Sequence, residues 1–143
     1  MIPSRFNIRV YGILIQGEKI LVTDEIRKGV KMTKFPGGGL EFGEGIADCL
    51  IREFKEELNV MIIVKSLFYI NEAYQVSSFN EKEQLLSVYY QVSLEEGEIK
   101  STETPFLFDT NEPQCFRWLD LNKINKNDVT FPIDKIVVEK LNT

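Results

Sequence analysis

Hydrophobic and β-branched residues form short runs along the first third of the chain, with polar residues between them. Residues 5–16 and 19–25 are two such runs on either side of Gly17, and this pattern predicts a hairpin-like pair of strands. Residues 26–34 are polar and basic, so we expect a loop there.

The rest of the chain mixes helical and strand periods. Apolar residues in 46–58 follow a helical spacing, and those in 131–141 recur at i, i+3, i+4 and i+8 from Ile133, which predicts two amphipathic helices. Strands are expected at residues 60–76, 84–96 and 115–121, with a long polar loop at 101–114. This order lacks strict βαβ alternation, so it favours an α/β fold with a mixed sheet flanked by helices.

Length and charge limit the class of protein. At 143 residues the chain is long enough to bury a core, and we expect a single domain over residues 1–143. A net charge of −5 argues against binding to nucleic acid or to an acidic membrane, because both require a cationic face. The start of the chain has no signal-like apolar segment, and its run "GILI" is far shorter than the roughly 20 residues of a membrane span. We therefore expect a cytoplasmic protein; the sequence does not fix its oligomeric state.

The titratable residues restrict the chemistry. Histidine is absent, which excludes histidine triads, histidine bases and histidine zinc sites. Cys49 and Cys115 are too far apart for a CxxC motif, and we expect both to be free thiols. Acid–base or metal chemistry must therefore depend on carboxylates.

Three carboxylates share one side of the predicted helix. Glu53, Glu56 and Glu57 lie at i, i+3 and i+4, next to the apolar stripe, where like charges repel. One interpretation is a solvated acidic face balanced by Arg52 and Lys55. The other is a site for a hard divalent cation such as Mg²⁺, which prefers oxygen ligands and removes the repulsion.

The segment "FPGGGLEFGEG", residues 35–45, directly precedes this helix. Glycines allow the backbone to approach a ligand closely, and a glycine carbonyl can supply an oxygen next to the carboxylates. A run of glycines alone is typical of a plain turn. Its fixed distance from the acidic helix favours a functional site.

Together these residues resemble the signature of the Nudix hydrolase family, which runs Gly, five residues, Glu, seven residues, Arg-Glu-aliphatic-x-Glu-Glu-x-Gly-aliphatic. The matching residues here are Gly38, Glu44, Arg52, Glu53, Phe54, Glu56, Glu57, Asn59 and Val60. Phe54 is apolar but not aliphatic, and Asn59 replaces glycine. Asn is the usual second choice for a left-handed residue after a helix, so we expect this change to be tolerated.

The resemblance implies an α/β/α sandwich and hydrolysis of a nucleoside diphosphate linked to another group. It implies Mg²⁺ or Mn²⁺ bound by Glu53, Glu56 and Glu57, with assistance from the Gly38 carbonyl. Glu53 is the candidate base, and Arg52 and Glu44 are candidates for positioning the carboxylates. In some members the base comes from a late loop, where Glu112 is the first candidate and Glu103 the second; both residues are equally consistent with a solvated loop.

The substrate is less well specified. Markers of ADP-ribose, dinucleoside polyphosphate and NADH hydrolases are absent, so the chain is most similar to compact nucleoside triphosphate pyrophosphohydrolases, and a small-molecule nucleotide is the expected partner. Lys135 occupies the position where the readers of oxidised purines in that group have Asn, so 8-oxo-guanine specificity is not expected. The candidate substrate contacts are Arg27, Lys28, Phe35 and Lys135, with Lys31, Lys34, Tyr74, Phe106 and Phe108 as weaker ones. The alternative is a catalytically silent nucleotide-sensing or protein-binding domain of the same fold.

Overall fold

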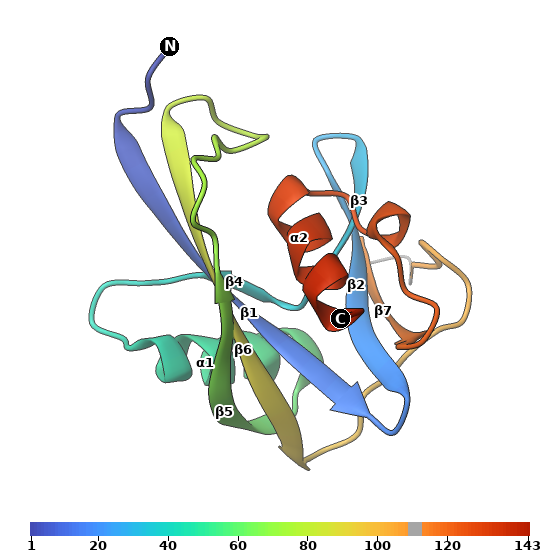
Figure 1. The fold of residues 1–143 in the computed structure, drawn as a ribbon. Coiled ribbons are helices and arrows are strands. Elements are labelled where there is room, and N and C mark those ends of the chain that lie inside the picture. The colour runs from blue at the N-terminus through green and yellow to red at the C-terminus, as the bar shows by residue number, and fades with distance from the viewer. Residues whose placement is uncertain (109–112) are drawn as a thin grey trace.

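The computed structural model describes residues 1–108 and 113–143, and its strands form one mixed sheet (Figure 1). The elements are β1 (Arg5–Gln16), β2 (Lys19–Arg27), β3 (Val30–Lys34), β4 (Gly37–Gly39), α1 (Ile46–Leu58), β5 (Met61–Ile70), β6 (Glu83–Glu96), β7 (Gln114–Asp120), a short 3₁₀ helix (Lys126–Asp128) and α2 (Pro132–Leu141). No helix of the described segments is long and apolar enough to cross a membrane.

The strand β1 lies at the centre of the sheet, whose main order is β3-β2-β1-β6-β5. It runs parallel to β6 over ten paired positions, while its last residues pair antiparallel with β2. On its other side β1 pairs with the short strand β4, where Arg9 lies opposite Gly39. Gly37, Gly38 and Gly39 of the 35–45 segment are therefore part of the sheet, next to the middle of β1.

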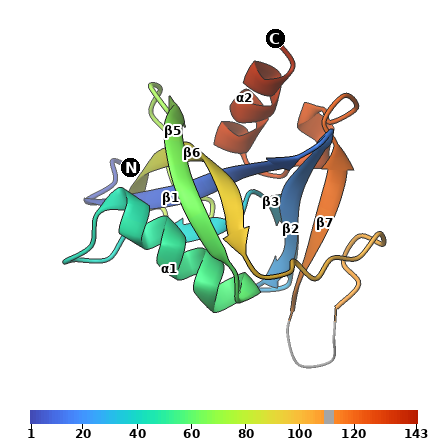
Figure 2. The same ribbon diagram turned by 90° about the horizontal axis from the view of Figure 1, so that it is seen from below.

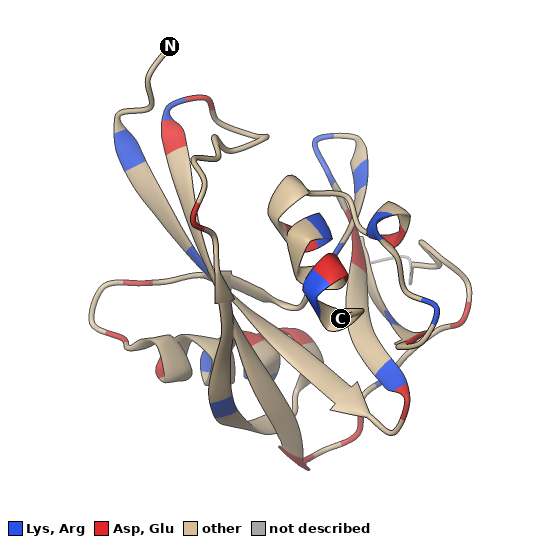
Figure 3. Cartoon of the chain, in the orientation of Figure 1, with Lys and Arg blue, Asp and Glu red and all other residues tan. Residues whose placement is uncertain are grey.

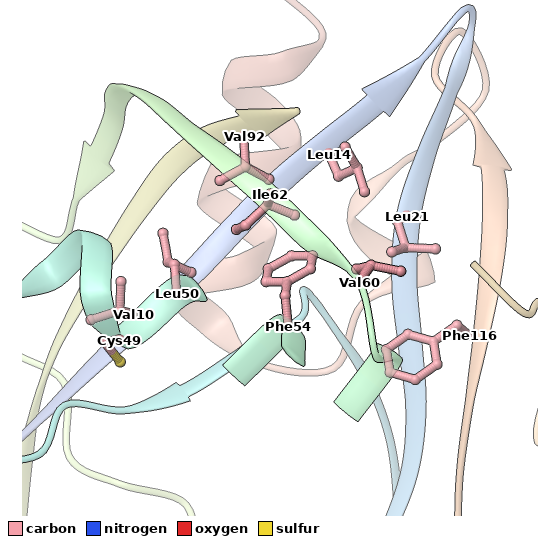
Figure 4. Close-up of a cluster of buried hydrophobic side chains, with 10 residues drawn as sticks. All are labelled: Val10, Leu14, Leu21, Cys49, Leu50, Phe54, Val60, Ile62, Val92 and Phe116. Atoms are coloured by element: carbon pink, nitrogen blue, oxygen red, sulfur yellow. The ribbon is translucent and has the colours of Figure 1, made fainter. Parts of the chain in front are cut away.

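Two hydrophobic clusters fill the two faces of the sheet, with α1 on one face and α2 on the other (Figure 2). Leu50 and Phe54 of α1 pack in the first cluster with Val10 and Leu14 of β1 (Figure 4). Ile13 of β1 is on the other side and packs in the second cluster, with residues of α2. This alternation along β1 confirms the expected α/β/α sandwich.

The prediction of a loop at residues 26–34 was wrong. Strand β2 continues to Arg27, β3 begins at Val30, and Arg27 and Val30 face each other across a two-residue turn. Lys28 and Gly29 have φ of 50° and 77°, the left-handed backbone that tight hairpin turns require. The sequence did not indicate this strand pair, because the turn and the residues next to it, 27–31, are mostly basic and all exposed.

The strand expected at residues 60–76 is shorter than predicted. Strand β5 ends at Ile70, and beyond it only Val76 forms an isolated bridge, to Gln84. The helix end was predicted correctly: Asn59 has φ 55° and ψ 40°, and its N–H donates to the carbonyl of Lys55 at 3.0 Å. The chain thus turns through a left-handed residue directly into β5.

Candidate active site

Arg52 of α1 joins the glycine-rich segment to the helix. Its Nε donates to Glu44 Oε2 at 2.9 Å and its Nη2 to Glu44 Oε1 at 2.7 Å, a two-pronged pairing that suits the planar guanidinium. The hydrogen bonds from Arg52 lower the pKa of the Glu44 carboxyl to about 2. Glu44 is therefore an anion near neutral pH, as the partner of Arg52 must be.

The same guanidinium also contacts the other acids of the helix. Nη1 donates to Glu53 Oε1 at 2.9 Å and to Glu56 Oε2 at 3.3 Å, while Nη2 donates to the Gly39 carbonyl at 3.0 Å. One cation thus offsets the repulsion expected between neighbouring carboxylates and fixes β4 relative to α1. Acidic positions lie on both α1 and the loop before it (Figure 3).

Gly38 lies directly against Glu53. A β-carbon at position 38 would overlap the carboxylate atoms of Glu53, so only glycine leaves this carboxylate its present place. The glycine of the motif therefore has a steric reason that follows from the structure. Glu53, whose carboxylate occupies this space, is also the candidate base predicted from the sequence.

Glu57 has a carboxylate oxygen that lacks a hydrogen-bond partner among the described residues. Its Oε2 atom is buried and makes no hydrogen bond within residues 1–108 and 113–143. Burial raises the pKa of Glu57 to about 7; the positive charge of Lys34 opposes this shift, and the charges of Glu53 and Glu25 add to it. A buried carboxylate oxygen without a partner is costly unless a cation binds it.

The residues of this site are chemically suited to a hard divalent cation. Within the described parts of the chain, no group of three acidic side chains is already arranged to hold a metal ion. Two of the acids expected to bind the cation, Glu53 and Glu56, instead accept hydrogen bonds from Nη1 of Arg52. The donors are nevertheless all oxygens, and the unpartnered Glu57 Oε2 is the type of atom that such a cation satisfies.

A cavity of about 340 Å³ lies between β1, the β2–β3 hairpin, the start of β6 and the start of α2. Aromatic side chains in its lining come from Tyr11, Phe79, Tyr89 and Phe131, and cationic ones from Arg9, Arg27, Lys28 and Lys34. Lys34 Nζ is 3.1 Å from Glu25 Oε2, and both residues also act on the pKa of Glu57. Lys34 and Glu25 of the cavity lining are thus close enough to Glu57 for their charges to act on it, although none of the described residues of α1 lines the cavity.

The structure divides the predicted substrate contacts into two groups. Arg27 and Lys28 line the cavity, as expected of contacts with a ligand. Phe35 does not, because it is fully buried and packs edge-on against Tyr89, with ring centroids 6.0 Å apart. Lys135 does not either, since its Nζ donates to the backbone carbonyls of Lys126 and Val129, both at 2.6 Å.

The weaker candidates are also separated. Lys34 lines the cavity, whereas Lys31 lies over the ring of Phe106, 5.2 Å from its centroid. Tyr74 and Glu103 are exposed and lie outside the cavity lining. Glu112 lies outside the described residues.

Sequence reasoning missed several residues of the cavity, above all Arg9 and Asp134. Asn7, Arg9 and Tyr11 are every second residue of β1, and this spacing of polar side chains was the available signal for a solvent-accessible face of the strand. Asp134 is 2% exposed and accepts a hydrogen bond from the Tyr89 hydroxyl at 2.5 Å. Burial raises the pKa of Asp134 to about 6, against the opposing effects of Tyr89 and Lys34.

Comparisons with known proteins show the family of the chain. The family described as NUDIX domain matches residues 5–140. Nucleoside diphosphate-linked moiety X motif 6 of Mus musculus is 28% identical over 130 residues, which are 89% of this chain but only 38% of the mouse protein. ADP-ribose pyrophosphatase of Methanocaldococcus jannaschii is 28% identical over 131 residues, 91% of this chain and 70% of that protein.

Solved structures share the fold. The crystal structure of the MutT protein from Methanosarcina mazei Go1 superposes with a TM-score of 0.73 at 15% identity, covering 99% of this chain and 96% of that one. At this identity the likeness concerns the arrangement of strands and helices. It places the acidic helix and the glycine strand in an architecture found in other proteins.

Proposed function

The chain belongs to the Nudix family, and from this premise we propose that it hydrolyses the pyrophosphate linkage of a nucleoside diphosphate joined to another group, in a metal-dependent reaction. The observation that carries the proposal is that two features lie near each other. One is a cavity with aromatic and cationic walls, whose lining residues Lys34 and Glu25 act on the charge of Glu57. The other is α1, where Arg52 holds Glu53, and where Glu57 Oε2 makes no hydrogen bond within residues 1–108 and 113–143. The aromatic and cationic walls of the cavity suit a planar, anionic ligand. The carboxylates of the helix suit the hydrolysis of its phosphate linkage.

The roles follow from the contacts of each side chain. Glu53, fixed between Gly38 and Arg52, accepts the proton of the attacking water. Arg52 and Glu44 hold Glu53 in place and keep the loop on the helix. Glu53, Glu56 and Glu57, with the Gly38 carbonyl, would hold Mg²⁺ or Mn²⁺, which when bound neutralises phosphate oxygens and activates water.

A nucleoside triphosphate or a related small nucleotide is the proposed substrate. Tyr11 and Phe79 offer aromatic surfaces for a base, while Arg27 and Lys28 offer positive charge. ADP-ribose is the second candidate, because the archaeal relative is named an ADP-ribose pyrophosphatase. The cavity residues themselves do not favour one of these ligands over the other.

A panel of nucleotides tests the proposal. Deoxynucleoside and nucleoside triphosphates, ADP-ribose, nucleotide sugars and dinucleoside polyphosphates are incubated with Mg²⁺ or Mn²⁺, and the products are resolved by ion-exchange chromatography. We expect cleavage of a pyrophosphate linkage in at least one class and none in a Glu56→Gln, Glu57→Gln double variant. A chain that cleaves nothing on the panel would contradict the proposal.

The rival proposal is a silent domain that binds a nucleotide or a protein without turnover. The Arg52 network argues against it, because three acids of the motif are present and engaged. The panel separates the two proposals if binding is measured beside cleavage. Saturable nucleotide binding without any product would support the silent domain.

A further inference from the structure

The side chain of Arg9 is a guanidinium inside the cavity with few protein partners. Its Nε donates to the Tyr11 hydroxyl at 3.1 Å, and Cζ lies 5.8 Å from the centroid of the same ring. Within residues 1–108 and 113–143, Nη1 and Nη2 of Arg9 make no hydrogen bond, and no carboxylate is within 4.0 Å of them. Four N–H donors of this lining residue thus have no acceptor among the described residues.

Two other arginines of the protein are saturated by comparison. Arg52 pairs with Glu44 through both prongs, and Arg117 pairs with Asp24 at 2.6 and 2.8 Å. These two side chains have structural roles that their contacts explain. The contacts of Arg9 leave most of its hydrogen-bonding capacity for a ligand.

Arg9 stays charged in this position. Burial lowers its pKa, but the Tyr11 hydroxyl and the carboxylates of Glu53 and Glu25 outweigh this effect, so that the pKa is raised overall. A cation that is half-buried, permanently charged and short of acceptors is suited to an anion.

The position of Arg9 brings it close to the acidic helix. Arg9 lies opposite Gly39 in the β1–β4 register, and its Nη1 lies 3.4 Å from the point that a β-carbon of Gly39 would occupy. Arg52 reaches the same glycine through its carbonyl, at 3.0 Å. Gly39 therefore lies between the guanidinium of Arg9 and the guanidinium of Arg52.

We propose that Arg9 binds a phosphate group of the ligand at the end of the cavity next to β4, as an anion site distinct from the carboxylates of α1. The inference rests on the proposed function, and it assigns the phosphate contact to a residue outside the Nudix motif. The planar fork of Arg9 donates to two oxygens of one phosphate, while the Tyr11 hydroxyl fixes its orientation. A ligand whose phosphates lie beside Glu53 needs such a cation, because the carboxylates alone repel it.

The test measures anion binding without turnover. The full chain is titrated with inorganic pyrophosphate in EDTA at low ionic strength by isothermal calorimetry, as parent, Arg9→Gln, Arg9→Lys and Lys65→Gln. Lys65 is exposed on β5, outside the cavity, and its replacement removes the same unit of charge. Melting curves of all four proteins show that each is folded.

We expect Arg9→Gln to raise the Kd for pyrophosphate by about tenfold or more, the usual effect of losing a charged hydrogen bond. Arg9→Lys keeps the charge but not the planar fork, so its Kd for pyrophosphate should lie between those of the parent and Arg9→Gln. Lys65→Gln should stay within about twofold of the parent, because only long-range charge changes. A parent that does not bind pyrophosphate, or equal binding by parent and Arg9→Gln, would overturn the proposal.

The outcome is separable from that of the proposed hydrolysis. If no nucleotide is cleaved but pyrophosphate binding depends on Arg9, the anion site stands and the hydrolase proposal fails. If nucleotides are cleaved and Arg9→Gln leaves both binding and KM unchanged, the hydrolase proposal stands and Arg9 has no part in phosphate binding.

Discussion

The carboxylate of Glu53 lies against the α-carbon of Gly38, in the space that any β-carbon at position 38 would need. The atoms in conflict are the end of a flexible side chain, so we expect Gly38→Ala to move Glu53 and to leave the backbone in place. Turnover should fall by about 10²-fold, the size of effect that a small misplacement of a reacting group can cause. Thermal unfolding should change little, by less than about 1 kcal/mol, because the fold can absorb the shift.

Gly39→Ala is the matched control for this prediction. Its β-carbon would meet only Arg9 Nη1, at an ordinary contact distance of 3.4 Å. It should therefore retain the position of Glu53 and most of the turnover number. Equal loss of kcat in the two variants would show that a β-carbon anywhere in β4 is harmful, and that the Gly38–Glu53 contact is not special.

Glu53→Gln tests the proposed base itself. The amide oxygen of Gln can still accept from Arg52, whose Nη1 is 2.9 Å from the present carboxylate, so metal-free stability should stay within about 1 kcal/mol of the parent. An amide cannot accept the proton of water, and kcat should fall by roughly 10²–10⁴-fold. The measurements are kcat on the nucleotide that the panel identifies and a melting curve in EDTA. Retention of more than about a tenth of the parental kcat would exclude Glu53 as the base.

A divalent cation should stabilise the native protein. Glu57 Oε2 has no hydrogen-bond partner among the described residues, and a ligand that binds only the folded state raises the free energy of unfolding. We expect millimolar Mg²⁺ or Mn²⁺ to raise the Tm, and the shift to disappear in the Glu56→Gln, Glu57→Gln double variant. Differential scanning calorimetry with and without EDTA provides the comparison. An unchanged Tm of the parent with both ions would count against cation binding by these acids.

Asn59 provides a test of local backbone conformation. Its φ of 55° is one that glycine adopts without strain, so Asn59→Gly should be neutral or slightly stabilising and should preserve activity. Asn59→Ala is the control, and it should lose about 1 kcal/mol because alanine tolerates this conformation less well. Urea unfolding at constant pH measures both. A glycine variant less stable than the alanine variant would be inconsistent with the left-handed end of α1.

The acidic helix and the position of Asn59 could be predicted because their signals are local. Glu53, Glu56 and Glu57 are close in sequence and on one side of a helix, so that periodicity alone groups them. The cavity could not be predicted in this way. Its lining comes from β1, the β2–β3 hairpin, the segment before β6 and the start of α2, and only the sheet topology brings these parts together.

The sequence indicated Lys135 as a substrate contact, whereas the structure places the preceding residue, Asp134, in the cavity lining. Successive residues of a helix differ in direction by about 100°, so a shift of one residue can turn a side chain away from the cavity. In α2, Asp134 faces Tyr89 and the cavity, and Lys135 is directed to the carbonyls of residues 126 and 129. A motif fixes the place along the chain, but the start of the helix fixes which side chain points inward.

The burial of Asp134 predicts a dependence of protein stability on pH. Its pKa is raised by burial from 3.8 to about 6, despite the hydrogen bond from Tyr89 and the charge of Lys34. A raised folded-state pKa means that the native protein binds more protons than the unfolded chain between these two values. The contribution of Asp134 to the free energy of unfolding therefore falls as pH rises from 3.8 to about 6, and is constant above.

Asp134→Asn removes this contribution, since an amide does not titrate, while its oxygen can still accept from the Tyr89 hydroxyl. The Tm of Asp134→Asn relative to the parent should therefore increase between pH 4 and pH 6.5, across the range set by a pKa of about 6. Melting curves in EDTA at half-unit steps of pH measure it. Tyr89→Phe removes the hydrogen bond that lowers the pKa of Asp134. In this variant, the pH range over which Asp134 loses its contribution to stability should therefore extend to higher pH. Parallel Tm profiles for Asp134→Asn and the parent would mean that Asp134 has the same pKa in the folded and unfolded states.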